Sequence, residues 1–218
     1  MPINNTVPLL IAQPMTYELI EPYGNLIQGS WDPSTMPARI KTNVVPNPQT
    51  AYKYNRQAPI ISTYPATSNA HTAIAIYRAT PPTGINLARG LSFDLRMFER
   101  HSFSSQAFLP LARGTGSDSV GESEGGMVVI VALNGSDDKP DMSTLKAFLL
   151  EPWQGISYNA GVWHHSVLTL SPVDYACVDT QITQDSSLKA DCEALRRGTD
   201  VAPWAKVYLP LRGEEITV

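Results

Sequence analysis

A run of alternating residues in the middle of the chain most constrains what the chain can fold into. Between positions 91 and 97 every second residue is large and apolar, and the residues between them are polar or charged: Leu91, Ser92, Phe93, Asp94, Leu95, Arg96 and Met97. Successive side chains of a β-strand point to opposite faces, so this pattern is typical of a strand with one buried face. The chain is therefore expected to contain a β-sheet packed on a core.

Several other segments have the length and apolar content of short strands, namely 72–78, 127–133, 146–150, 167–170, 174–179 and 206–211. The segment 127–133 is apolar throughout, which indicates a strand covered on both faces. Many short strands at close spacing, in a chain with 18 prolines, predict a mainly β fold, an antiparallel barrel or sandwich. Only short helices are expected beside it: a turn over 15–19 capped by Thr16, and a longer helix over 185–197, whose apolar residues recur at helical spacing.

The length of 218 residues suits one domain with a substantial core, so a single domain over 1–218 is expected. Residues 30–70 are rich in Pro, Asn, Ser, Thr and Tyr and are interpreted as an irregular insertion. Residues 113–126 are rich in Gly, Ser and Glu and are expected to form a mobile loop.

The composition argues against several classes of function. The net charge is −4 and no Lys/Arg-rich run is present, so nucleic acid is not an expected partner. No apolar stretch approaches the ~18 residues of a membrane span, and the N-terminus lacks the features of a signal peptide. Two cysteines do not form a disulfide framework, which fits a reducing cytoplasm.

Two polar segments stand out: residues 99–106, Glu-Arg-His-Ser-Phe-Ser-Ser-Gln, and residues 159–165, Asn-Ala-Gly-Val-Trp-His-His. They hold three of the four histidines, and Glu, His and Gln side chains bind metals or handle protons. If the strand that begins at Leu91 runs on regularly, Glu99 and His101 project to the same face as its apolar residues and point inward. Burying a Glu and a His is costly unless they are paired or bound. They form either an internal Glu–His contact or part of a functional site.

The spacing of these segments resembles the two signature segments of cupin barrels. The first runs His-x-His and then, three or four residues later, Glu; here Glu99, His101 and Gln106 match a degenerate form of it. The second is Pro-x-Gly-x-x-His; here residues 159–164, ending at His164, match it with Asn in place of Pro. The resemblance implies a cupin-like barrel or jelly roll in which these four side chains converge, usually on a divalent metal.

The identity of such a metal stays open, because mixed imidazole and carboxylate ligands suit nickel, manganese, iron and zinc alike. The same groups can instead act without a metal, with Glu99 and His164 sharing acid and base roles. No organic cofactor is expected. His164 and His165 are neighbours and face opposite sides of an extended strand, so at most one lines the cavity directly, and His164 is assigned to it.

A closer resemblance covers residues 72–181. Residues 98–111, 129–133, 138–148, 154–165 and 174–179 follow the order and spacing of corresponding segments in ureidoglycolate lyases. The family's Glu-Arg-His…Gln-Ala-Phe-Ile-Pro segment is matched by residues 99–110, and its Gln-Gly-Val-Asn-Tyr…Val-Trp-His-His segment by 154–165. The chain departs from the family at Ser166, where the family has Pro, and at Thr180, where Arg is common.

The resemblance implies that (S)-ureidoglycolate is cleaved to glyoxylate and urea, late in allantoin and purine breakdown. A base removes the proton of the carbinolamide hydroxyl, the carbonyl forms, and the C–N bond to urea breaks with help from an acid or a Lewis acid. Glu99 or His164 is the candidate base. His101 and Gln106 are candidates for binding metal or orienting the substrate.

Further residues are candidates for substrate binding. Arg78 matches a family Arg and can hold a carboxylate bidentately, with a salt bridge at the rim as its alternative role. Lys139 and Tyr158 match family positions, with roles in a surface turn and in packing as their alternatives. His165 is either a substrate contact or an outward residue at a strand end. Asp179 either positions a histidine or ends a strand.

Three other functions compete with the lyase. One is a ureidoglycolate hydrolase that releases ammonia, and another is a metal-dependent cupin oxygenase or isomerase. The third alternative belongs to a different class of function: a non-catalytic barrel that binds a small metabolite. In every case the expected ligand is a small molecule, and a twofold homodimer is the default assembly.

Overall fold

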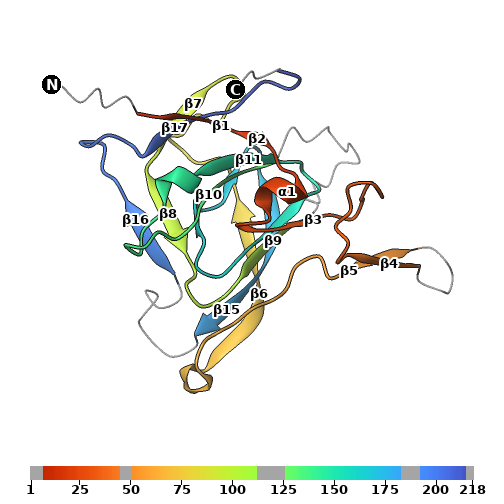
Figure 1. The fold of residues 1–218 in the computed structure, drawn as a ribbon. Helices are drawn as coiled ribbons and strands as arrows, with labels where there is room; N and C mark the ends of the chain where they lie inside the picture. Colours follow the sequence, from red (N-terminus) through yellow and green to blue (C-terminus); the bar gives the residue numbers. More distant parts are fainter. Residues whose placement is uncertain (1–6, 45–50, 112–125, 183–191, 215–218) are drawn as a thin grey trace.

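The computed structural model describes residues 7–44, 51–111, 126–182 and 192–214, and β-strands are the main regular structure in them (Figure 1). A five-stranded sheet has the order β3 (Gly24–Ile27), β12 (Gly155–Tyr158), β9 (Gln106–Leu111), β15 (Val173–Ile182) and β6 (Ala70–Ala79). A seven-stranded sheet has the order β16 (Glu193–Arg196), β8 (Met97–Arg100), β13 (Trp163–His164), β10 (Met127–Ala132), β11 (Lys146–Leu150) and β2 (Gln13–Pro14), with β14 (Leu168–Thr169) also paired to β10.

Two smaller sheets complete the strands. One has the order β1 (Leu9–Ile11), β17 (Ala205–Tyr208) and β7 (Ser92–Leu95), and the other is the hairpin of β4 (Lys41–Val44) and β5 (Tyr52–Asn55). The helical elements are short: α1 (Tyr17–Ile20), η1 (Ala66–Ser68) and η2 (Met142–Thr144). No helix among the described ranges is long and apolar enough to cross a membrane. The prediction of a mainly β fold, rich in antiparallel pairs and cupin-like, is confirmed.

The seven-stranded sheet lies between two hydrophobic cores. On one face, Val129 and Val131 of β10 pack with side chains of the five-stranded sheet such as Phe108. On the other face, Val128 and Ile130 pack with side chains of β7 and β17. Every residue of β10 is buried, as its continuous apolar sequence predicts.

Several predicted elements appear with nearly the predicted bounds. Residues 146–150 form β11 as expected, and the predicted strand over 72–78 extends by a residue or two at each end to become β6. The turn over 15–19 becomes α1, and the Thr16 hydroxyl accepts a hydrogen bond from the Leu19 N–H at 3.4 Å. These segments are correctly predicted because their local pattern agrees with their tertiary surroundings.

The prediction of one regular strand over 91–101 is wrong, because the chain breaks at Arg96 into β7 and β8, which belong to different sheets. The break reverses the alternation: Leu95 and Phe98 are both buried in the same core, although they are three residues apart. Glu99 therefore lies on the face of β8 opposite Phe98. Its side chain is turned inward, as predicted, but towards the other core.

The prediction of a helix over 185–197 is also wrong for the part of this range that the structure describes. Residues 183–191 lie outside the described residues, and Glu193–Arg196 form strand β16, paired antiparallel with β8. The interpretation of residues 30–70 as wholly irregular needs correction too, since this insertion contains β4, β5 and η1. The predicted loop over 113–126 falls almost entirely outside the described residues.

A buried arginine ties β8 to its surroundings. Arg100 is 5% exposed, and its guanidinium donates to Asn134 and Asp138 at 2.8 Å and to Glu193 at 2.7 Å. It also lies 4.4 Å from the centre of the Trp163 ring. One side chain thereby connects β8, the turn after β10, β13 and β16.

Replacing Arg100 with Met is expected to lower the free energy of unfolding by about 2–3 kcal/mol, because several charge-assisted hydrogen bonds are lost together. The loss is limited because Asp138 is largely exposed and Glu193 is partly exposed, so both carboxylates become hydrated. Urea denaturation measures it. Arg197→Met is the matched control, since Arg197 also lies over a tryptophan, Trp204, but at the surface. Equal losses in the two variants would contradict the role of the Arg100 cluster.

Candidate active site

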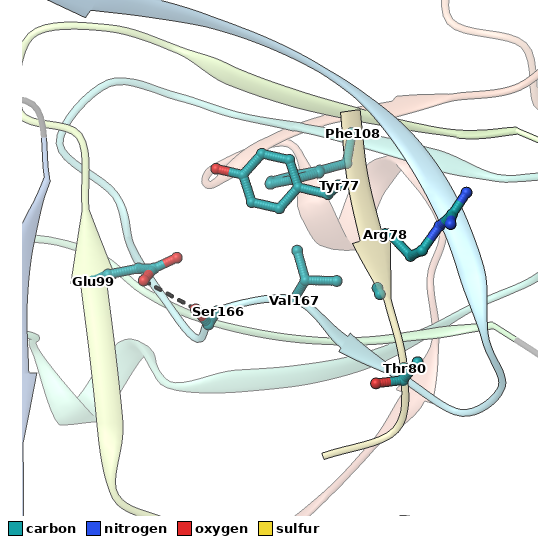
Figure 2. A pocket seen from close by; sticks show the side chains of 8 residues that line it. Tyr77, Arg78, Thr80, Glu99, Phe108, Ser166 and Val167 are labelled. Carbon is teal, nitrogen blue, oxygen red and sulfur yellow. Dashed lines mark hydrogen bonds between the residues drawn. The ribbon is translucent and has the colours of Figure 1, made fainter. Parts of the chain in front are cut away.

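A pocket of about 330 Å³ opens beside β6 and reaches the carboxylate of Glu99 on β8 (Figure 2). Its lining residues come from four separate segments: Tyr77, Arg78, Ala79, Thr80, Glu99, Phe108, Ser166 and Val167. The volume lies in the range of pockets that take small organic molecules. An aromatic and aliphatic wall with one carboxylate and one guanidinium is suited to a small polar ligand.

Glu99 is the acidic residue of this lining. Its side chain is 18% exposed, and the Ser166 hydroxyl donates to one carboxylate oxygen at 3.1 Å. Burial raises the pKa of the Glu99 carboxyl above its usual value, although the Ser166 hydrogen bond and the charge of Arg196 act in the opposite direction. A carboxylate with a raised pKa is a stronger base than one in water, so Glu99 is suited to proton transfer.

His164 lies next to Glu99 because β13 and β8 are paired, with these two residues directly opposite. The His164 Nε2 is 3.8 Å from the other Glu99 carboxylate oxygen. Nδ1 is 3.0 Å from the Val162 carbonyl oxygen, and a carbonyl only accepts, so Nδ1 carries the proton and Nε2 has a lone pair. That Nε2 is buried and has no hydrogen-bond partner among the described residues.

Burial also fixes the charge of His164. The ring is 2% exposed and stacks on Tyr158 with 4.1 Å between ring centres. Desolvation, assisted by His101, lowers the pKa of His164 to about 3. His164 is therefore neutral near pH 7, and it faces Glu99 as a hydrogen-bond acceptor and not as a cation.

The other two members of the predicted set lie beside this pair. His101 follows β8, and its ring centre is 5.9 Å from that of His164. Gln106 begins β9 opposite Tyr158, is 3% exposed, and contacts the Cys177 thiol. The structure thus brings Glu99, His101 and His164 together. The pocket lining includes Glu99 but not His101, Gln106 or His164.

Metal binding by Glu99, His101, Gln106 and His164 stays a prediction. Within the described ranges, no group of three or more His, Cys, Asp or Glu side chains is arranged to hold a metal ion. Of the predicted set, His101 approaches His164 through its ring face, and Gln106 contributes a neutral amide. No step of the chemistry below is therefore assigned to a metal.

The predicted substrate-binding residues have different positions. Arg78 lies at the pocket rim, is 78% exposed, and pairs with Asp174 at 3.2 Å, which is its alternative role as a rim salt bridge. Figure 2 shows its side chain directed away from Glu99. Tyr158 is buried under His164. Lys139 is exposed in the turn after β10, outside the pocket lining.

Two other candidates are buried outside the pocket lining. His165 is 8% exposed, and its Nδ1 is 3.0 Å from the Ser166 carbonyl oxygen. Asp179 lies within β15, where Gln181 donates to it at 3.0 Å and the Cys177 thiol lies 3.7 Å away. The contacts of Asp179 involve neighbours on its own strand.

The sequence patterns did not identify Tyr77, Phe108 or Ser166 as part of the site. Tyr77 projects from β6 into the space that Glu99 faces, and its ring packs edge-on against Phe108 at 5.3 Å (Figure 2). Burial, with a contribution from nearby acidic groups, raises the pKa of Tyr77 to about 12, so its hydroxyl stays protonated. Only Ser166 had a signal in the sequence, as the residue that departs from the Pro expected after the two histidines.

Comparisons with known proteins agree on one family. A family model described as ureidoglycolate lyase matches residues 7–202. The chain is 30% identical over 165 residues to a ureidoglycolate lyase of Schizosaccharomyces pombe, a match that covers 74% of this chain and 78% of the relative. It is 38% identical over 109 residues to a ureidoglycolate lyase of Escherichia coli strain SMS-3-5, which covers 50% of this chain and 56% of that relative.

Proposed function

Because the chain belongs to the ureidoglycolate lyase family, we propose that it splits (S)-ureidoglycolate into glyoxylate and urea. The observation that carries the proposal is the Glu99 carboxylate, which lines a pocket of about 330 Å³ and is held there by Ser166. The proposal extends to allantoin and purine breakdown in the cytoplasm, and to a homodimer as the working assembly.

The reaction needs one proton to move from an oxygen to a nitrogen. Ureidoglycolate carries a hydroxyl and a ureido group on the same carbon. When a base removes the hydroxyl proton, the C=O bond of glyoxylate forms, the C–N bond breaks, and the nitrogen of the leaving urea takes up a proton. Glu99 is suited to both transfers, because a carboxylate that accepts the proton can return it to the nitrogen a moment later.

Neighbouring residues support this transfer. The lone pair on the His164 Nε2 faces Glu99 and can accept a hydrogen bond from the protonated Glu99 carboxyl. The Tyr77 hydroxyl stays protonated and can donate to the oxygen that becomes the glyoxylate carbonyl. Arg78 is the cation of the pocket lining, and a substrate carboxylate that binds it at the rim takes the place of Asp174 on its guanidinium.

Purified protein supplied with ureidoglycolate is expected to form glyoxylate and urea in equal amounts. Glyoxylate is followed by its reduction in a coupled assay, and urea and ammonia are measured separately in the same samples. Ammonia in place of urea contradicts the lyase and supports the hydrolase. Oxygen consumption coupled to turnover would instead support an oxygenase, and binding without turnover would support the metabolite-binding barrel.

Dependence on a divalent metal is predicted from the resemblance to cupins and is tested separately. The protein is treated with a strong chelator, its metal content is measured, and activity is assayed before and after divalent ions are restored. Loss of activity that one ion restores would establish a metal. Full activity in verified metal-free protein removes the metal from the mechanism and leaves Glu99 and its neighbours as the acid–base machinery.

A further inference from the structure

Strand β16 lies at the edge of the seven-stranded sheet and pairs with β8, the strand that carries Glu99 (Figure 1). The register places Ala194 opposite Glu99, and Arg196 follows two positions further along β16. Leu195, between them, packs on the core that also holds Phe98, so its two neighbours project to the other face of the sheet, as Glu99 does. Arg196 is therefore a diagonal neighbour of Glu99. Diagonal neighbours have Cβ atoms about 7–8 Å apart, within reach of long side chains.

The guanidinium of Arg196 is available to a ligand. The residue is exposed, and no described residue makes a hydrogen bond or an ion pair with its side chain. Its charge nevertheless acts on the site: burial is the main influence on the pKa of Glu99 and of His165, and the charge of Arg196 contributes to both. An unpaired cation beside a candidate base is suited to hold an anionic ligand.

The reaction brings an anion to this place. The carboxylate of ureidoglycolate is bonded to the carbon that carries the reacting hydroxyl. When Glu99 is within hydrogen-bond distance of that hydroxyl, the substrate carboxylate lies only a few ångströms from the Glu99 carboxylate, and the two negative charges repel each other. A guanidinium next to Glu99 offsets this repulsion and can hold the substrate carboxylate through two parallel hydrogen bonds.

Arg78 is less suited to this role, although it belongs to the pocket lining and Arg196 does not. The Arg78 guanidinium is already paired with Asp174 at 3.2 Å, and Figure 2 shows its side chain directed away from Glu99. A substrate carboxylate must displace Asp174 to bind there. At Arg196 it displaces only water, and it stays beside the candidate base.

We propose that Arg196 binds the substrate carboxylate beside Glu99 and so selects carbinolamides that carry a carboxylate. The assignment rests on the proposed function, because it names the residue that recognises one end of that substrate. The carboxylate keeps its charge throughout the cleavage, so Arg196 binds it equally well in the ground state and in the transition state. Arg196 therefore governs KM more than kcat.

Steady-state kinetics test the proposal. Arg196→Gln is expected to raise KM for ureidoglycolate about 10–100-fold, the range for losing a hydrogen bond to a charged group, with kcat nearly unchanged. Arg196→Lys keeps the charge without the planar fork, so an intermediate KM is expected. Arg197→Gln is the matched control, because Arg197 is the next residue but lies over Trp204. An unchanged KM in Arg196→Gln, or a larger rise in Arg78→Gln, overturns the proposal.

Binding of oxalurate separates this proposal from the proposed function. Oxalurate keeps the ureido group and the carboxylate of the substrate but has a carbonyl in place of the carbinol, so it cannot be cleaved in the same way. Titration calorimetry is expected to show about 10–100-fold weaker binding of oxalurate to Arg196→Gln and unchanged binding to Arg197→Gln. The neutral amide of oxalurate is expected to bind both variants as it binds the unmodified protein.

The outcomes distinguish the two claims. Equal weakening for oxalurate and its neutral amide contradicts a contact between Arg196 and the carboxylate. Oxalurate binding that depends on Arg196, in a protein that does not cleave ureidoglycolate, overturns the proposed function alone. Cleavage by the unmodified protein, with the same KM in Arg196→Gln, overturns the role of Arg196 alone. A protein that neither binds oxalurate nor cleaves ureidoglycolate overturns both.

Discussion

Replacing Glu99 with Gln is expected to reduce kcat/KM about 10²–10⁴-fold, the range typical for losing a general base. The amide has nearly the same shape and still accepts the hydrogen bond from Ser166, but it cannot take the hydroxyl proton of the substrate. Stability is not expected to fall, because burial raises the pKa of the Glu99 carboxyl and the folded protein therefore disfavours its charge. The measurements are steady-state kinetics and a thermal melt.

Glu18→Gln serves as the control, since Glu18 is an exposed residue of α1. It should retain the kinetics of the unmodified protein. A Glu99→Gln variant that keeps more than about a tenth of the activity would show that another group accepts the proton. A variant that loses activity together with its folded structure would be replaced by Glu99→Asp, which keeps the carboxylate but moves it away from the substrate.

His164→Ala is expected to lose about 10²–10³-fold more kcat/KM than His165→Ala. His164 presents a lone pair to Glu99 at 3.8 Å, whereas His165 lies outside the pocket lining with its Nδ1 at the Ser166 carbonyl. The magnitude corresponds to the loss of a group that assists proton transfer. Comparison within the pair isolates the effect on catalysis, because both rings are buried and both truncations leave a cavity.

The pair must be compared at matched folded fractions, determined from urea denaturation of each variant. His164→Gln adds a second test, because its side-chain oxygen can still accept a hydrogen bond from Glu99, and partial recovery of kcat is expected. Similar losses in His164→Ala and His165→Ala would refute the assignment of the site to His164.

The sequence allowed the strands to be predicted where local pattern and tertiary environment agree, and failed where they compete. Alternation identified a strand near Leu95, but it does not reveal the break at Arg96. Arg96 donates to the carbonyl oxygens of Gly198 and Val201, far along the chain, and such contacts leave no local pattern. Likewise, residues with helical spacing become β16 because β8 offers an edge and Arg100 binds Glu193.

The candidate site was predictable to a similar extent. Glu99, His101 and His164 are polar residues in strand-like segments, and their type and order marked them as a group. Tyr77 and Phe108 were not predicted, because an aromatic residue in a strand has the same local pattern whether it lines a pocket or fills a core. The rim salt bridge of Arg78 also depends on a partner, Asp174, that lies on another strand.

The position of β10 between both cores has a consequence for how the protein melts. Val129 and Val131 belong to one core and Val128 and Ile130 to the other, so neither core can come apart while the other keeps this strand in place. The two cores should therefore lose structure in one calorimetric transition, with equal van't Hoff and calorimetric enthalpies. An Ile130→Val change should then lower the melting temperature without splitting the peak, and amide protons on both sides of the strand should exchange through the same global opening.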